Sequence, residues 1–345
     1  MAKPIDHRRR EPAPGVLRLV LPLPFPGLDR VNCYLLLGDD GTSTLVDCGI
    51  YLPENQRDHS WTDLVAAFEG AGVDVSTVDR LLITHPHIDH YGMAGRFLEE
   101  TGAELLIHEA ADEDLELYRD PHAVVDRLQK MFAQHGVDEE ELAELTQFED
   151  WRPFVSGLPE GSRRLKDGEK IGIGPRSWEV VFTPGHARSH VCLWSPNDRI
   201  LISGDHLLPT VTPHIDFKRG ENSDPLGDFL ESLKKVERLD PAMVLPGHGG
   251  PFEEGAERAL VVARHHDRRL GAILQVIRNR PATVDTITDE IFGDELLNFQ
   301  HRLALGEAFA HVVYLLRRGE IERVEEDGAH MFKKVRRRRD GDDES

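Results

Sequence analysis

The sequence predicts an α/β sheet sandwich with a metal-binding edge, a helical insertion and a C-terminal appendage. Three observations support this fold class. Short apolar runs end in Pro or Gly turns that carry His or Asp, at intervals between residues 81 and 248. A polar segment from Ala110 to about Phe154 has apolar residues at helical spacing. The last part of the chain reads as helical runs followed by two short strands.

The first strand end predicts a site for two metal ions. It is the segment Thr84–His90, which follows the apolar run Leu81–Ile83. Side chains alternate on an extended segment, so His85 and His87 can reach one ion together. Asp89 and His90 then turn away to serve a second ion. A single His-x-His in a chain with 18 histidines carries little weight, but the full pattern after a strand is specific.

Three further strand ends supply the remaining ligands that a dinuclear site needs. The apolar runs Val180–Phe182, Ile200–Ile202 and Met243–Leu245 lead through Pro or Gly turns to His186, Asp205 and His248, respectively. Each unit is a strand, a turn and then a ligand. Four such strand ends can bring their donors together at one edge of a sandwich.

With these motifs the chain resembles the metallo-β-lactamase-fold hydrolases over roughly residues 15 to 250. The family motifs are matched by His85, His87, Asp89, His90, His186, Asp205 and His248. Leu45–Gly49 resembles the strand-end Asp-x-Gly of that fold, and Asn32–Leu36 its entry strand. The resemblance implies an αββα metallo-β-lactamase sandwich. It also implies that one ion takes His85, His87 and His186, that the other takes Asp89, His90 and His248, and that Asp205 bridges.

The donor chemistry agrees with this division. Nitrogen and oxygen donors suit zinc and also manganese or iron, so we expect two divalent ions, Zn²⁺ first and Mn²⁺ or Fe²⁺ as alternatives. Two ions about 3.5–4 Å apart can share a water whose pKa falls to about 7, which gives a bridging hydroxide as the nucleophile. Asp89 and Asp205 are the residues predicted to be catalytic. No serine or cysteine nucleophile is required.

Other residues are predicted to support the site from behind or to line its pocket. Asp47 is expected to orient a ligand by hydrogen bonding, with a simple turn residue as the alternative. His190 is given the same supporting role, and the role of His206 is left open. The weaker candidates for the substrate pocket are Tyr91, His214 and Lys218, of which the last two lie in a proline-rich loop, 207–218.

The cysteines and the N-terminal residues argue against three classes of protein: β-lactamases with a cysteine ligand, exported proteins and membrane-spanning proteins. Cys33, Cys48 and Cys192 lie in apolar strand-like sequence and are expected to be buried free thiols. The β-lactamases of this fold that use a cysteine ligand have it where Asp205 stands, so that subclass is disfavoured. The segment Met1–Pro14 lacks the apolar stretch of a secretory signal, and no stretch has membrane-spanning length, so a cytoplasmic location is expected.

The chain is longer than a typical single domain, at 345 residues. We predict a catalytic domain over 15–255 with a helical insertion at about 110–154, and a winged-helix-like domain over 256–338. The insertion is interpreted as a cap, with Met131, Phe132 and Phe148 among its apolar residues, that closes over the metals. The alternative is that these are ordinary scaffold helices of the sandwich.

The C-terminal part has the order of a winged helix. It reads as helices Ala259–Arg278, Val284–Ile291 and Gln300–Arg318, then strands Ile321–Val324 and Met331–Val335. It resembles the winged-helix appendage of the lactamase-beta-2-like branch of the fold, including the run Leu303–His311. The basic run Arg336–Arg339 is followed at once by acidic residues, and the third helix has few basic groups. We therefore expect the appendage to serve in packing, in formation of a homodimer or in closing the pocket, in preference to contacting RNA.

Two enzymatic functions follow from these patterns. The first is hydrolysis of a small ester-like substrate. A thioester is the preferred substrate, as in the glyoxalase-II-like and acyl-carrier thioesterase members that the chain resembles. The second is single-strand endoribonuclease activity, which is found in the lactamase-beta-2-like branch. A net charge of −21 repels phosphate backbones and favours the first. A metal-binding protein without catalysis would need a lost ligand, and none is missing.

Overall fold

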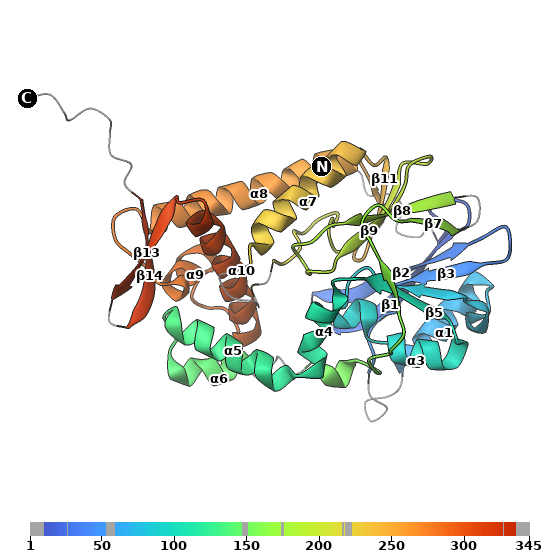
Figure 1. Cartoon of the computed structure of the whole chain (residues 1–345), viewed down its shortest axis with the longest axis horizontal. Coiled ribbons are helices and arrows are strands. Elements are labelled where there is room, and N and C mark those ends of the chain that lie inside the picture. The colour runs from blue at the N-terminus through green and yellow to red at the C-terminus, as the bar shows by residue number, and fades with distance from the viewer. Residues whose placement is uncertain are drawn as a thin grey trace, which may run out of the picture. The chain divides into compact units, whose positions relative to one another are not determined.

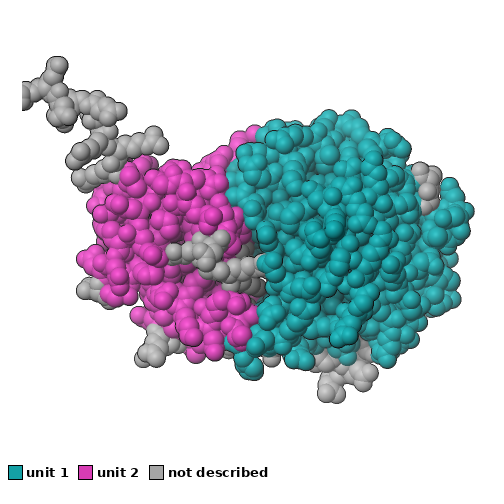
Figure 2. Space-filling view, viewed as in Figure 1, with its two compact units in different colours: residues 1–122, 149–214, 227–263 teal, residues 123–148, 215–226, 264–345 magenta. Residues whose placement is uncertain are grey.

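The computed structural model describes residues 10–25, 27–52, 59–146, 151–173, 176–215, 217, 223–326 and 328–335. The chain divides into two compact units, coloured separately in Figure 2. The first unit comprises residues 1–122, 149–214 and 227–263, and the second comprises residues 123–148, 215–226 and 264–345.

The first unit contains two mixed sheets of six strands (Figure 1). One sheet has the order β1 (Val16–Phe25), β2 (Leu28–Leu37), β3 (Ser43–Val46), β4 (Arg80–Leu82), β5 (Glu104–His108) and β6 (Arg163–Leu165). Its first three strands are antiparallel, and β3 to β6 are parallel. The other sheet has the order β12 (Phe252–Glu253), β11 (Met243–Pro246), β10 (Ile200–Gly204), β9 (Val191–Ser195), β8 (Arg176–Phe182) and β7 (Lys170–Ile173). Among the described strands of this sheet, only β10 and β11 pair in parallel.

The alternation of side chains along the strands builds two hydrophobic clusters. In β2, Tyr34 and Leu36 join a cluster that also includes Val180 and Ile202 of the other sheet. Cys33 and Leu35 point the opposite way and join the cluster beneath the helices. This period of two is what a strand buried on both faces requires.

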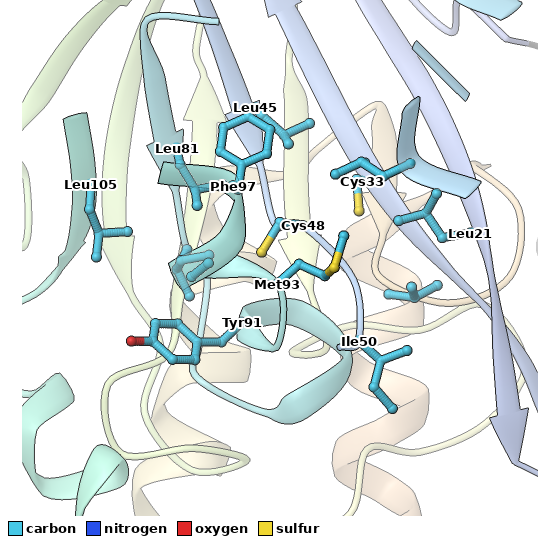
Figure 3. Packing of buried hydrophobic residues seen from close by; sticks show 14 of the residues in the cluster. Leu21, Cys33, Leu45, Cys48, Ile50, Leu81, Tyr91, Met93, Phe97 and Leu105 are labelled. Carbon is cyan, nitrogen blue, oxygen red and sulfur yellow. The ribbon is translucent and has the colours of Figure 1, made fainter. Parts of the chain in front are cut away.

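Helices cover both outer faces, which completes the predicted αββα order. On the first sheet, α1 (His59–Ala71), α3 (Ala94–Thr101) and α4 (Ala111–Arg119) bury residues such as Phe68, Phe97 and Tyr118. Figure 3 shows Phe97 and Met93 packed over Leu45, Leu81 and Cys48. On the second sheet, α7 (Pro225–Leu239) is held by hydrogen bonds from Ser232 and Lys235 to carbonyls at the end of β8. The short helices are η2 (Val75–Thr77), α2 (Ile88–Tyr91) and η3 (Arg152–Phe154).

The three cysteines are buried and free, as the sequence predicted. Burial raises the pKa of the Cys33 and Cys48 thiols well above the usual range and that of Cys192 to about 12. All three are therefore packing residues in the neutral form. Among the residues that the structure describes, no helix has both the length and the apolar character that crossing a bilayer requires.

The second unit is a small domain of helices and a hairpin. It contains α5 (Pro121–Gln134, from residue 123), α6 (Glu139–Thr146), α8 (Gly255–Val276, from residue 264), α9 (Val284–Phe292), α10 (Asn298–Arg317) and the hairpin β13 (Ile321–Glu326) with β14 (Ala329–Lys334). The predicted order of three helices and a hairpin is therefore present, and the predicted ends differ by a few residues. The predicted boundary at residue 256 falls in the first turn of α8, and the predicted domain limits stay a prediction.

Two helices of the predicted insertion pack on the C-terminal elements (Figure 1). The His301 Nδ1 lies 2.8 Å from a carboxylate oxygen of Glu141 in α6. The His135 ring, which follows α5, packs edge-on against Phe309 of α10 and parallel to Phe332 of β14. The backbone N–H of Asp285 donates to the His135 carbonyl. These helices thus share a core with the appendage. Their interpretation as a cap over the metals stays a prediction, and Phe148 lies outside the described residues.

Candidate metal centre

The predicted ligands lie at the ends of β4, β8, β10 and β11, as the sequence indicated. Thr84 to His87 continue from β4 without helical structure, and α2 begins at Ile88 with His87 as its N-cap. His85 and His87 therefore precede the helix, while Asp89 and His90 lie in its single turn. This change of backbone directs the two pairs to different places.

All seven predicted ligands come together in overlapping groups. Ligand atoms lie within 4.8 Å of one another in three such groups: His85, His87 and His186; Asp89, His90 and His248; and His85, His90 and Asp205. The first two are the groups expected for the two ions. Asp205 lies between them, since its Oδ2 is 3.7 Å from His186 Nε2 and 3.2 Å from His248 Nε2. That is where a bridging carboxylate would be needed.

The hydrogen bonds of four histidines leave Nε2 as the free ligand atom. The Nδ1 atoms of His186 and His248 donate to the carbonyls of His214 and Arg30, at 2.7 Å and 2.8 Å. His90 Nδ1 donates to Asp47 at 2.8 Å. The Thr84 hydroxyl donates to Asp47, so it accepts from His85 Nδ1 at 3.0 Å. Fixing Nδ1 in this way sets the tautomer that a metal ligand requires.

The inward-facing atoms fit metal ions. The Nε2 atoms of His85 and His186 are buried and make no hydrogen bond to the described part of the chain. Those of His90 and His248 face the carboxylates, with His90 Nε2 3.4 Å from Asp205 and His248 Nε2 3.1 Å from Asp89. Buried polar atoms without partners are costly, at about 1–3 kcal/mol each. Divalent cations held between nitrogen and carboxylate donors would satisfy all of them.

The charges of the group also favour cations. Burial opposes ionisation of Asp89, but His90 and His248 outweigh it and hold the pKa of that carboxyl at about 2. The pKa of Asp205 is likewise well below its usual range, because His248 and His90 outweigh burial. Burial would lower the pKa of His248, yet Asp205 and Asp89 raise it to about 10. The carboxylates are therefore ionised at neutral pH and attract positive charge, and metal binding would compete with protons.

Asp47 occupies a strained position behind the ligands. Its φ of 60° lies in the left-handed region, which is uncommon for a residue other than glycine. The carboxylate accepts hydrogen bonds from the Thr84 N–H and hydroxyl and from His90, and it is buried. A conformation of this kind persists only where its surroundings fix it. The geometry is that of a residue that orients His90.

His190 supports Asp205 through the backbone. Its Nε2 accepts from the Asp205 N–H at 3.2 Å, so its Nδ1 donates to the Thr183 hydroxyl at 2.8 Å. Burial lowers the pKa of His190 well below the usual range, which keeps the imidazole neutral in this tautomer. A side chain at Gly204 would place its Cβ 2.8 Å from His190 Nε2, which explains the glycine before Asp205.

Contacts around the His248 turn were not found by sequence reasoning. Asn32 Nδ2 donates to the carbonyls of Pro246 and Gly249, and the Tyr34 hydroxyl donates to Pro246 as well. Arg18 donates to Asn32 and to the Gly249 carbonyl. A Cβ at position 247 would lie 2.3 Å from Asp205 Oδ1. The available signal was polar residues, Asn32 and Tyr34, inside an otherwise apolar strand.

The three weaker candidates for the substrate pocket differ in where the structure places them. Tyr91 is 1% exposed, packs in the cluster of Figure 3, and stacks on Tyr118. His214 contributes its backbone carbonyl to His186. Lys218 lies outside the described residues. His206 is fully buried beside Phe229 and belongs to none of the metal-competent groups found among the described residues.

The family of this chain follows from comparison with known proteins. The model of the metallo-beta-lactamase superfamily matches residues 26–248, and the model of a metallo-beta-lactamase-like C-terminal domain matches residues 270–335. The chain belongs to the metallo-beta-lactamase superfamily. The predicted family and the two-part architecture are thereby confirmed, and so is the enzyme class of a metal-dependent hydrolase, while the substrate is left open.

Individual relatives cover most of the chain. It is 27% identical to the probable metallo-hydrolase YqjP of Bacillus subtilis over 93% of this chain and 98% of that protein. It is 24% identical to a beta-lactamase-like protein 2 homolog of Caenorhabditis elegans over 79% of this chain and 74% of that protein. Among solved structures, the metallo-beta-lactamase family protein TTHA1429 of Thermus thermophilus is similar with a TM-score of 0.80 and 30% identity, over 94% of this chain and 99% of that one.

Proposed function

We propose that this member of the superfamily is a dinuclear metal-dependent hydrolase of a small ester-like substrate, a thioester first. The observation that carries the proposal is the pair of adjacent ligand groups whose buried Nε2 atoms face one another and the carboxylates of Asp89 and Asp205. Zinc is the metal proposed first, with manganese and iron as alternatives, because the donors are nitrogen and oxygen.

The chain's own residues have separable roles in this reaction. Two bound divalent ions would supply an activated water of pKa about 7 and polarise the electrophile. His85, His87 and His186 would hold one ion, and Asp89, His90 and His248 the other. Asp205 would join them and keep the spacing. Asp47 and Thr84 hold His90 and His85 in their tautomers, and His190 holds the backbone of Asp205, so that the donors are oriented before substrate binds.

The surface chemistry of the second unit favours a small substrate over RNA. Arg302, a basic residue of α10, is 2% exposed and therefore cannot contact a phosphate backbone. Arg318, which follows α10, pairs with Asp224 at 3.0 Å. In the hairpin, Lys333 pairs with Glu322 at 3.2 Å. Nucleic-acid binding depends on exposed cations that phosphates can reach.

The single-strand endoribonuclease is the second candidate, and one observation favours it. Three helices followed by a hairpin is the element order of winged helices, which commonly bind nucleic acid, and we propose that fold for the C-terminal domain. The basic run Arg336–Arg339 lies outside the described residues. Formation of a homodimer through this domain also stays a prediction.

The test is hydrolysis of a panel of acyl thioesters beside a fluorescent single-stranded RNA by the zinc-loaded protein. The Asp89→Ala protein is the blank, and His122→Ala, which removes an exposed histidine, is the matched control. We expect thioester turnover that is lost in Asp89→Ala, kept in His122→Ala, and accompanied by intact RNA. Metal-dependent RNA cleavage without thioester turnover would replace the proposal with the endoribonuclease. If the protein hydrolyses neither thioesters nor RNA, the proposal of a thioester substrate is refuted.

A further inference from the structure

A second group of metal-competent side chains lies in the second unit, apart from the seven residues described above. It consists of His266 from α8 and Glu307 and His311 from α10. Residues four apart on a helix share one face, so Glu307 and His311 point the same way, toward the facing helix. Ligand atoms of the three residues lie within 4.8 Å of one another. The two histidines are fully buried, and Glu307 is 9% exposed.

The hydrogen bonds of His311 fix which atom it offers. Its Nδ1 lies 2.7 Å from the carbonyl of Glu307, one turn earlier, and a carbonyl only accepts. Nδ1 therefore carries the proton, and Nε2 presents a lone pair. That lone pair lies 3.1 Å from Nδ1 of His266. This is the arrangement found at His186 and His248, where a backbone carbonyl also holds Nδ1.

The separation of the two nitrogens fits coordination of one ion. Metal–nitrogen distances of about 2.0–2.1 Å in a tetrahedral site place neighbouring ligand atoms about 3.3 Å apart. Both rings are fully buried, and the neutral imidazole is the form that binds a metal ion.

Glu307 supplies the charged donor that a buried cation needs. Arg269, one turn after His266 on α8, contacts one oxygen of the Glu307 carboxylate. A carboxylate has two oxygens, so Glu307 can hold Arg269 with one and an ion with the other. The ion pair would then orient the ligand, as outer partners do at known metal sites.

We propose that His266, Glu307 and His311 form a structural site for a divalent first-row metal ion, with zinc as the ion that suits two imidazoles and a carboxylate. The site joins α8 to α10, so metal binding stabilises the second unit. It is independent of the hydrolytic site, because it shares no residue with it.

The test is metal analysis of the purified full chain after zinc loading and dialysis. His266→Gln is expected to lower the zinc content by one equivalent per chain relative to the unmodified protein. His330→Gln, which removes a half-buried histidine of β14, is the matched control and is expected to leave the zinc content unchanged. Equal zinc contents in His266→Gln and the unmodified chain would show that His266 and His311 are only a hydrogen-bonded pair.

A second experiment distinguishes metal bound at this site from metal bound at the hydrolytic site. With Asp89→Ala and His186→Ala introduced together, we expect one zinc equivalent to persist, and cobalt loaded in its place to give the visible absorption of a nitrogen-ligated ion. Glu307→Gln in that background is expected to remove both the zinc equivalent and the cobalt absorption. This variant replaces His266→Gln as the test if His266→Gln does not fold. If the background protein retains no metal and no cobalt absorption, the proposal is overturned, whatever the substrate of the hydrolytic site.

Discussion

Replacing Asp47 with asparagine tests whether the strained carboxylate orients the metal ligands. Asp47 accepts from the Thr84 N–H, the Thr84 hydroxyl and His90 Nδ1, each at 2.8 Å to one of its oxygens. Asparagine has nearly the same shape and tolerates the left-handed backbone at φ 60°. One side of its amide is an NH₂ group, however, so at least one donor loses its acceptor.

The expected magnitude follows from the chemistry of these bonds. A hydrogen bond to a charged group contributes about 1.5–3 kcal/mol, so the free energy of unfolding of the metal-free protein should fall by about that amount. Loss of an outer partner of a ligating histidine usually weakens metal affinity by about 10–100-fold. We expect both effects in Asp47→Asn, because either the His90 ring or the Thr84 backbone is released.

The assay is competition for zinc with a chromophoric chelator, together with urea unfolding of the metal-free protein. Asp240→Asn is the matched control, since Asp240 also has a positive φ of 49° but accepts from Arg199 at the surface. The control should change neither quantity by more than about 0.5 kcal/mol. If Asp47→Asn lowers the free energy of unfolding but leaves the zinc affinity unchanged, the orienting role is refuted.

Three further predictions concern the candidate metal centre, the hydrophobic core and a buried histidine of the second unit. Asp89→Ala or His186→Ala should abolish metal-dependent hydrolysis with unchanged far-UV circular dichroism; retained turnover in either would remove that residue from the site. Phe97→Ala, at a fully buried position, should lower the free energy of unfolding in urea by about 3–5 kcal/mol, and Val211→Ala, at an exposed position, by less than about 0.5 kcal/mol. Burial, with His330 and Arg323, lowers the pKa of His135 from 6.5 to about 3, so the unfolded chain binds the additional proton. Stability should therefore fall as pH drops from about 6.5 toward 3, and His135→Gln should reduce that slope in urea titrations at pH 7.5 and 5.

The residues that meet at the candidate metal centre could be predicted because each follows a local pattern. A short apolar strand, a Pro or Gly turn and a metal-competent residue occupy consecutive positions, so His186, Asp205 and His248 could be read without knowledge of the tertiary structure. The C-terminal helices and hairpin were readable for the same reason, since periodicity and turn residues are local signals.

The packing of the insertion was not a local property. The sequence indicated a helical insertion, interpreted as a cap with scaffold helices as the alternative, and it gave no signal for the residues on which α5 and α6 pack. The partners are His301 on α10 for Glu141 and the rings of Phe309 and Phe332 for His135, all more than 150 residues later in the chain. Amphipathic helices show that a face is buried, but they do not show against what.

The same limit explains why the sequence could indicate the residues of the candidate metal centre but not the orientation of their side chains. His186, His248 and His311 each donate Nδ1 to a backbone carbonyl, of His214, Arg30 and Glu307. Every residue has a carbonyl, so the acceptor leaves no signature in the sequence. Only the fold selects it, and that selection sets the tautomer. A histidine with Nδ1 fixed by a carbonyl and a buried Nε2 that faces other potential ligands is therefore a stronger sign of a metal site than its spacing, and His186 and His248 meet this criterion.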